Sequence, residues 1–161
     1  MGKKITIIIA VIAVLFIALF FALNYKNNKA LEGDNPYGTD NLEQATIDQI
    51  GDPLYENQIL PDDLIEQVNS GEPTTVYFYS PTCVYCQQTT PYLVPLTEEM
   101  DVDMVKLNLL EFGQEAAPFA IQSTPTLVHY EDGKEVARLE GQYPKEEYEE
   151  FFNQYVLDEE K

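Results

Sequence analysis

The chain has few positive charges. Its 161 residues include 28 acidic and nine basic side chains, and the formal net charge is −19. All the acids lie from Glu32 onward, where the bases number only five: Lys106, Lys134, Arg138, Lys145 and Lys161. A surface this acidic repels nucleic acid and anionic lipid head groups. We therefore predict no nucleic-acid partner and interpret the acidic side chains as a solubilising coat.

Soft metal ligands are also scarce. The chain has one histidine, His129, and two cysteines, Cys83 and Cys86. A structural zinc site needs about four ligands. His129 lies inside a run typical of a strand, where a packed or half-exposed side chain is the simpler interpretation. The sequence therefore predicts no metal site.

Charge is absent from residues 5–23, ITIIIAVIAVLFIALFFAL. As a helix, this stretch would be about 28 Å long, close to the hydrocarbon thickness of a bilayer. A cleaved secretory signal is the alternative, but its apolar region is usually about 7–15 residues and ends in a small-x-small site. Residues 18–20 and 22–24 lack the second small residue, and no cysteine follows that could carry a lipid. We expect an uncleaved anchor.

Lysines flank this apolar stretch on both sides. Lys3, Lys4 and the chain amino group precede it, while Lys26 and Lys29 follow it. The slight excess before the span predicts a cytoplasmic N-terminus over residues 1–4 and a C-terminal part outside the cytoplasm.

Residues 24–57 are rich in Asn, Gly, Asp and Pro, as in NKALEGDNPYGTDN. Such a composition predicts a mostly flexible stalk. Residues 42–50 could form a short helix, and whether it packs on the following domain is left open.

Regular patterns begin at residue 58 and define a domain over residues 58–161. The predicted order is a helix at PDDLIEQVNSG, a buried strand at TTVYFYS, a helix over residues 83–100 kinked at Pro91, and a strand at VDMVKLNL. A short helix or loop at EFGQEAAPFAI, strands at TPTLVHY and DGKEVARLEG, and an amphipathic helix at KEEYEEFFNQYV follow. A short strand near residues 58–60 could precede them. This order predicts an α/β fold, a sheet with helices on both faces.

The two cysteines form a C-x-x-C pair at the start of a predicted helix. A disulfide across two residues closes so short a loop that it would stabilise the fold little. A reaction centre fits better, because helix N-terminal N–H groups and the helix dipole stabilise a thiolate. Cys83 is then the nucleophile. Cys86, one turn further on the same side, is placed to resolve a mixed disulfide.

Four separated motifs resemble the thioredoxin family over roughly residues 58–156. They are CVYC after a β-rich strand, Pro91 eight residues after the first cysteine, KLN at residues 106–108, and STPTLVHYEDGKEVARLEG at residues 123–141. The resemblance implies a cis Thr124–Pro125 peptide facing the cysteines. It also implies that Thr124 pairs through its backbone with an extended client and that Gly141 keeps the adjacent loop open. Tyr85 is expected to contact the client.

The departures from the family concern residues that tune reactivity. Thr82 replaces the usual tryptophan, and Val84 with Tyr85 replaces Gly-Pro. Tyr77 stands where the family has a buried aspartate that helps proton transfer to the resolving cysteine. Its lysine neighbour is kept as Lys106, expected to be a snorkelling surface lysine, although its charge could favour a nearby thiolate.

Two further departures concern subfamily. No histidine separates the cysteines, unlike in strong oxidants. The short connection over residues 98–102 lacks the insertion of the membrane-anchored cytochrome-maturation reductases.

The sequence thus predicts a membrane-tethered, extracytoplasmic thiol–disulfide oxidoreductase, from a bacterium and by its anchor and stalk a Gram-positive one. Its chemistry would need no cofactor beyond a redox-active Cys83–Cys86 disulfide. Its partners would be protein thiols and disulfides outside the cytoplasm.

With only two cysteines, the protein also requires a separate redox partner, predicted to be membrane-embedded. The alternatives are a redox-inert binding or chaperone module and an accessory subunit of a secretion or bacteriocin system. The direction of electron flow stays open.

Overall fold

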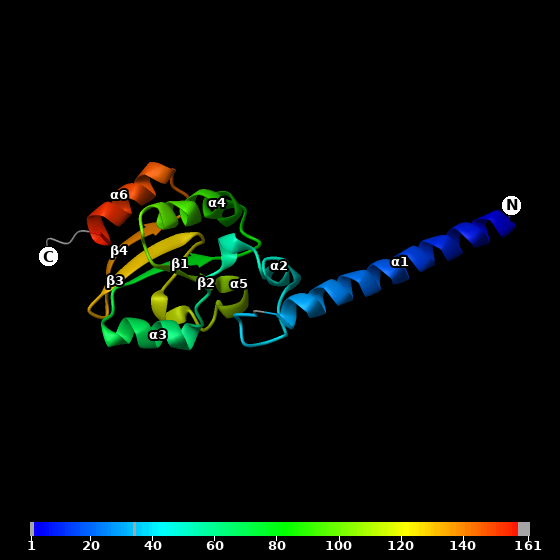
Figure 1. Cartoon of the computed structure of the whole chain (residues 1–161), viewed down its shortest axis with the longest axis horizontal. Coiled ribbons are helices and arrows are strands. Elements are labelled where there is room, and N and C mark those ends of the chain that lie inside the picture. Colours follow the sequence, from blue (N-terminus) through cyan, green and yellow to red (C-terminus); the bar gives the residue numbers. More distant parts are fainter. Residues whose placement is uncertain (1, 34, 158–161) are drawn as a thin grey trace.

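The N-terminal apolar segment is one long helix that projects from a folded domain. The computed structural model describes residues 2–33 and 35–157, and its first element is α1, Gly2–Leu31. Figure 1 shows this helix leaving the domain beside α2 and touching nothing else along most of its length. Its length and composition suffice to cross a membrane. The helix continues beyond the apolar stretch, through polar residues 24–31, because no proline or glycine interrupts it there.

The domain follows the order of elements that the sequence predicts. They are α2 (Gln44–Ile47), η1 (Pro53–Tyr55), α3 (Pro61–Ser70), β1 (Thr74–Tyr79), α4 (Val84–Glu99), β2 (Met104–Asn108), α5 (Leu109–Phe112), η2 (Ala117–Phe119), β3 (Thr126–Glu131), β4 (Lys134–Glu140) and α6 (Lys145–Tyr155). The possible strand near residues 58–60 is reduced to a single parallel bridge between Gln58 and Lys106.

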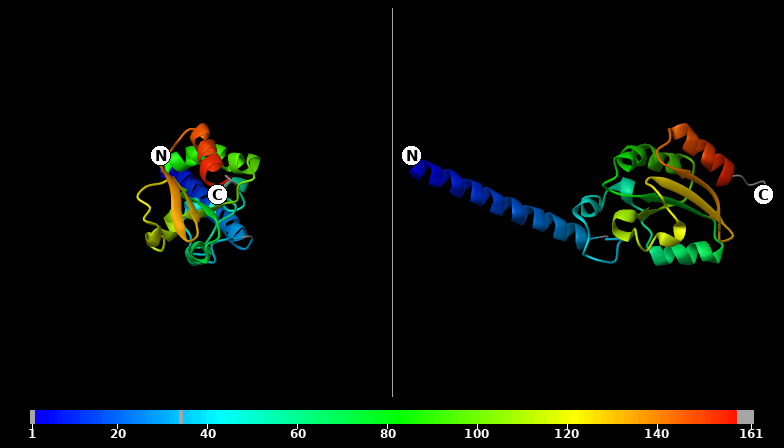
Figure 2. Two further views of the ribbon diagram at one scale, coloured as in Figure 1. Left: turned by 90° about the vertical axis from the view of Figure 1, so that its left-hand side faces the viewer. Right: turned by 180° about the vertical axis from the view of Figure 1, so that it is seen from behind.

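The sheet is mixed and has the strand order β2-β1-β3-β4. Strand β1 pairs parallel with β2 and antiparallel with β3, and β3 forms a hairpin with β4. Helices α4 and α6 cover one face and α3 covers the other (Figures 1 and 2). This arrangement confirms the predicted α/β class with helices on both faces of the sheet.

Strand β1 lies at the centre of two hydrophobic cores. All six of its residues are buried, as predicted for TTVYFY. Side chains alternate between faces along a strand. Tyr77 and Tyr79 therefore join the core under α4 and α6, while Val76 and Phe78 join the core over α3. Each large apolar side chain buried in this way stabilises the fold by about 1.5–3 kcal/mol.

Part of the predicted stalk is packed on the domain. Tyr37 is only 4% exposed, and Thr46 and Ile47 are also buried. The ring of Tyr37 lies 6.2 Å from that of Phe112 between centroids. The structure therefore differs from the flexible stalk predicted over residues 24–57, because this polar segment carries a few side chains that find a complementary surface. We call residues 37–47 the strap.

Candidate active site

Cys83 lies where strand β1 gives way to helix α4. The loop over residues 80–83 follows Tyr79, and Cys83 is the N-cap residue of the helix with extended backbone angles. Its sulfur accepts a hydrogen bond from the backbone N–H of Cys86 at 3.4 Å. Both cysteines are free thiols in this structure. The helix covers residues 84–99, one residue shorter at each end than predicted.

The two thiols differ in burial and acidity. Cys83 is partly exposed, and burial alone would raise its pKa. Hydrogen bonds from the Thr124 side chain and from Cys86 and Tyr85 outweigh burial, so the pKa of Cys83 is lowered. Cys86 is 1% exposed. Burial first, and then its contact with Cys83, raises the pKa of Cys86 to about 12. The outer thiol is therefore the stronger candidate for a thiolate nucleophile.

The loop before β3 faces Cys83. The Cys83 thiol donates a hydrogen bond to the Thr124 carbonyl oxygen at 3.2 Å. The Thr124–Pro125 peptide is cis, as predicted. The Pro125 carbonyl in turn accepts a hydrogen bond from the Gly141 N–H at 2.7 Å. The structure thus brings together three parts of the chain that lie far apart in the sequence: Cys83, the Thr124–Pro125 loop and Gly141.

Gly141 has a φ of +98°, which a residue with a side chain rarely adopts. Apart from Gly141 and its two chain neighbours, no atom of the described residues lies within 4 Å of where its Cβ would be. The space beside Gly141 is therefore open.

The dipeptide between the cysteines is exposed beside the reactive sulfur. Val84 and Tyr85 are each 59% exposed. Thr82 is exposed as well, and its hydroxyl lies 3.0 Å from that of Ser80. Large apolar side chains that protrude beside a nucleophile provide contact area for a partner.

Tyr77 lies beneath the buried cysteine. Its hydroxyl is 3.3 Å from that of Thr90, which donates to the Cys86 carbonyl at 2.8 Å. Burial raises the pKa of Tyr77 above its ordinary value, so this phenol stays neutral at physiological pH. Sequence reasoning missed Thr90, although its position four residues after Cys86 on a helix could have indicated the contact.

Lys106 is buried, and the prediction of a snorkelling surface lysine is wrong. It is 3% exposed, and its Nζ donates to the Glu56 carbonyl at 2.6 Å. The reason is its register, because Lys106 sits opposite Tyr77 in the paired strands and is covered by the segment around Glu56. Burial lowers the pKa of Lys106 to about 8, and the charges of Glu56 and Glu98 partly oppose this shift.

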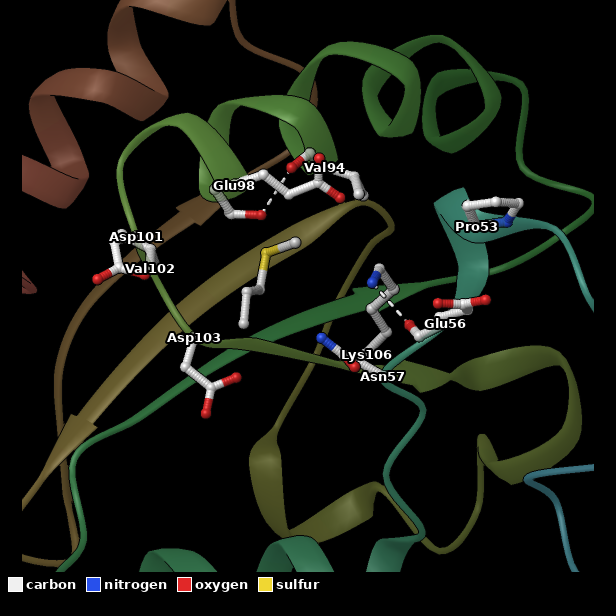
Figure 3. Close-up of a pocket in the computed structure, with 11 residues that line it drawn as sticks. Pro53, Glu56, Asn57, Val94, Glu98, Asp101, Val102, Asp103 and Lys106 are labelled. Carbon is white, nitrogen blue, oxygen red and sulfur yellow. Dashed lines mark hydrogen bonds between the residues drawn. The ribbon is translucent and has the colours of Figure 1, made fainter. Parts of the chain in front are cut away.

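A cavity of about 310 Å³ lies beside this lysine (Figure 3). Acidic side chains line it, namely Glu56, Glu98, Asp101 and Asp103. Among the described residues, Lys106 is the only basic one that lines it. The cavity thus brings a lysine and several carboxylates into one recess between α4 and β2.

A partly exposed thiol of lowered pKa at the start of α4, with a second, buried thiol in the first turn of that helix, is the arrangement of a dithiol–disulfide exchange protein. The sequence model of the family described as Thioredoxin matches residues 58–154. The chain belongs to the thioredoxin family.

Relatives and solved structures agree with this assignment. The chain is 27% identical to a thioredoxin of Porphyra purpurea over 69% of this chain and 98% of that protein. It is 34% identical to a thioredoxin of Haemophilus influenzae over 55% of this chain and 85% of that protein. The crystal structure of Chlamydomonas reinhardtii thioredoxin f2 is similar with a TM-score of 0.53 and 28% identity, covering 60% of this chain and 93% of that one.

Family membership implies thiol–disulfide oxidoreductase activity in general, with protein thiols or disulfides as substrates. The family match begins at residue 58, so it does not include α1 or the strap.

Proposed function

We propose that this protein is a membrane-tethered thiol–disulfide oxidoreductase that acts outside the cytoplasm, with Cys83 as nucleophile and Cys86 as resolving thiol. The observation that carries the proposal is the asymmetry of the pair. Cys83 is accessible at the N-terminus of α4 with a lowered pKa, and Cys86 is buried directly behind it with a raised pKa.

The reaction follows from this asymmetry. The Cys83 thiolate attacks one sulfur of a client disulfide, forming a mixed disulfide and releasing the first client thiolate. Cys86 then loses its proton and attacks the Cys83 sulfur, which releases the second client thiolate and leaves a Cys83–Cys86 disulfide. Two electrons pass to the client in this direction, and the reverse sequence oxidises a client dithiol.

The client would lie along the open surface beside the cis loop. The backbone of Thr124 would pair with an extended segment of the client, and this mode of binding reads little sequence. Tyr85 offers apolar contact area on one side, and the open space at Gly141 receives the chain on the other. Broad specificity for protein disulfides would follow.

The proposal of a membrane tether is supported by helix α1. Its apolar residues 5–23 match a bilayer in length, and the lysines before it favour a cytoplasmic N-terminus. The acidic domain would then stand outside, in a bacterium and by our interpretation a Gram-positive one. The two cysteines of the chain require a second protein that restores their redox state, which we place in the membrane.

The test uses the full chain in vesicles with two cysteine variants and one control. Cys83→Ser should abolish disulfide exchange, whereas Cys86→Ser should accumulate mixed disulfides visible on non-reducing gels. Gln88→Ser, an exposed change in the first turns of the same helix, should leave exchange unchanged. Full exchange in Cys83→Ser would show that Cys83 is not the nucleophile, and no exchange by the native chain would show a redox-inert binding module instead. The intact mass of the membrane-bound protein tests whether α1 is retained.

A further inference from the structure

The strap is attached to the domain at two specific points. The Tyr37 hydroxyl lies 3.3 Å from that of Tyr79 and accepts a hydrogen bond from the Asn108 amide at 3.5 Å. That amide also donates to the Thr46 hydroxyl at 3.0 Å, and Thr46 donates to the Glu111 carboxylate. Buried polar contacts of this kind hold a segment in one place, because breaking them leaves buried groups without partners.

These attachment points share an edge of the sheet with the reactive cysteine. Tyr79 is the last residue of β1 and Asn108 is the last residue of β2, and the two are register partners in a parallel pair. The carboxyl ends of parallel strands meet at one edge. Cys83 follows Tyr79 by four residues, so it lies at that same edge. Figure 1 shows the loop from β1 to α4 at the end of the domain nearest α2 and α1.

Helix α1 is in turn joined to the strap. The side-chain amides of Asn27 and Gln44 exchange hydrogen bonds of 2.8 and 3.2 Å, and Lys26 pairs at 3.1 Å with Asp48, the residue that follows the strap. These contacts are exposed and individually weak. Chain length sets a firmer limit, because the six peptide links from Leu31 to Tyr37 span at most about 20 Å.

The strap therefore shortens the reach of the domain from the membrane. Residues 24–31 continue α1 for about 12 Å beyond the apolar stretch. The strap then holds Tyr37, its attachment point on the active-site edge, within roughly 30 Å of the hydrocarbon boundary. If residues 24–57 were a free stalk, the same edge could reach more than about 100 Å. The acidic domain would be repelled by anionic lipids, so it stands off the bilayer and does not lie on it.

We propose that the strap presents the Cys83 edge to the membrane surface, and that the partner of this site is a membrane protein whose cysteines lie just outside the bilayer. This inference rests on the proposed function of the same cysteines. A partner held in the same plane meets Cys83 at a raised effective concentration, and a client far from the membrane does not.

The test measures reduction of two probes by the reduced full-length protein in the same vesicles. Each probe is a single-span peptide with one cysteine capped as a mixed disulfide with a chromogenic thiol. The near probe carries that cysteine just outside the span, and the far probe carries it on a rigid helical spacer of about 60 Å. The same capped peptide without a span is the soluble reference.

The native chain should reduce the near probe at least about 10-fold faster than the far probe. A flexible Gly/Ser insertion of about twenty residues between Glu32 and Gly33 should lower that ratio to below about 3-fold. Tyr37→Ala, which removes the strap's buried ring, should lower it in the same direction. Tyr130→Ala removes a buried tyrosine on the other face of the sheet, so it is the matched control and should keep the native ratio. All four chains should reduce the soluble reference within about 2-fold of one another.

Equal rates for the two probes with the native chain would overturn the proposal and point to soluble secreted clients. A ratio that the insertion leaves unchanged would overturn it as well. Failure of the native chain to reduce even the soluble reference would refute the proposed oxidoreductase function, which separates the two conclusions.

Discussion

The sulfur of Cys83 lies between the carbonyl oxygen of Thr124 at 3.2 Å and the backbone N–H of Cys86 at 3.4 Å. The carbonyl oxygen accepts a hydrogen bond from the thiol, and the N–H donates a hydrogen bond to the sulfur. Loss of the proton breaks the first bond and strengthens the second, because a charged acceptor forms the stronger hydrogen bond. The β3 loop and the start of α4 therefore jointly control the ionisation of one thiol.

The first prediction concerns the selectivity of alkylation. In the reduced protein at pH 7.5, iodoacetamide should modify Cys83 at least about 30-fold faster than Cys86. The pKa of Cys83 is lowered and that of Cys86 is raised to about 12, and the greater intrinsic nucleophilicity of the more basic thiolate offsets about half of the resulting advantage in thiolate population. The burial of Cys86 adds to the difference. Mass spectrometry of the alkylated peptides against time measures both rates.

The pH dependence of the same reaction has a definite sign. The alkylation rate of Cys83 should rise with pH and reach a plateau. The midpoint of this rise should lie below the ordinary thiol pKa of 9.0, because the pKa of Cys83 is lowered. Unfolding in urea should remove the selectivity. If Cys86 were alkylated before Cys83 in the folded protein, the assignment of Cys83 as nucleophile and Cys86 as resolving thiol would be wrong.

The second prediction concerns the residue that ties the strap to the sheet. Asn108→Ala should lower the free energy of unfolding by about 2–3 kcal/mol, because several buried groups lose a partner. Besides the hydroxyls of Tyr37 and Thr46, the Leu110 N–H loses its acceptor at the start of α5. Urea unfolding of the full chain in detergent measures the loss. Asn69→Ala, at an exposed position of α3, should change stability by less than about 0.5 kcal/mol.

The strap marks the limit of what the sequence could predict about the fold. Strand β1 was predictable because every residue of TTVYFY is β-branched or aromatic, which indicates a strand buried on both faces. The docking of Tyr37 was not, because its partners Tyr79 and Asn108 lie 42 and 71 residues away and its own neighbours are polar. Local composition indicates how a segment interacts with residues near it in the sequence, whereas the strap is held by residues far from it in the sequence.

The candidate active site likewise has features that the sequence could predict and features that it could not. Cys83, Cys86 and the Thr124 loop were predictable because spacing and motif place them at the ends of elements. The burial of Lys106 was not, because it depends on the chain around Glu56 crossing over β2. A lysine in a strand is usually exposed at its tip, and only the tertiary cover reverses that expectation.

The third prediction concerns Tyr85. Its exposed ring should contact protein clients, so Tyr85→Ala should raise KM for a protein disulfide about 5-fold, corresponding to about 1 kcal/mol of lost contact. Because the ring is 59% exposed, stability should change by less than about 0.5 kcal/mol. The rate with a small aromatic disulfide should stay the same, which separates binding from chemistry. An equal loss with both substrates would place Tyr85 in the chemistry of Cys83.

The fourth prediction concerns the buried charge of Lys106. Burial lowers the pKa of Lys106 from 10.5 to about 8 in the folded state. Between these two values the unfolded chain binds more protons than the folded one, so stability rises with pH across this interval. Below pH 8 the ammonium stays charged in both states, and its burial destabilises the fold by its full amount.

Replacing this lysine isolates its contribution from that of every other titrating group. The difference in free energy of unfolding between the native chain and Lys106→Met should shift by about 2 kcal/mol in favour of the native chain from pH 7 to pH 9.5. Urea titrations of both chains at the two pH values measure it. Lys134→Met, at an exposed position of the β3–β4 hairpin, should show a much smaller shift. A difference that does not change with pH would mean that the Lys106 ammonium is as well solvated in the folded protein as in the unfolded chain, contrary to its burial beside Glu56.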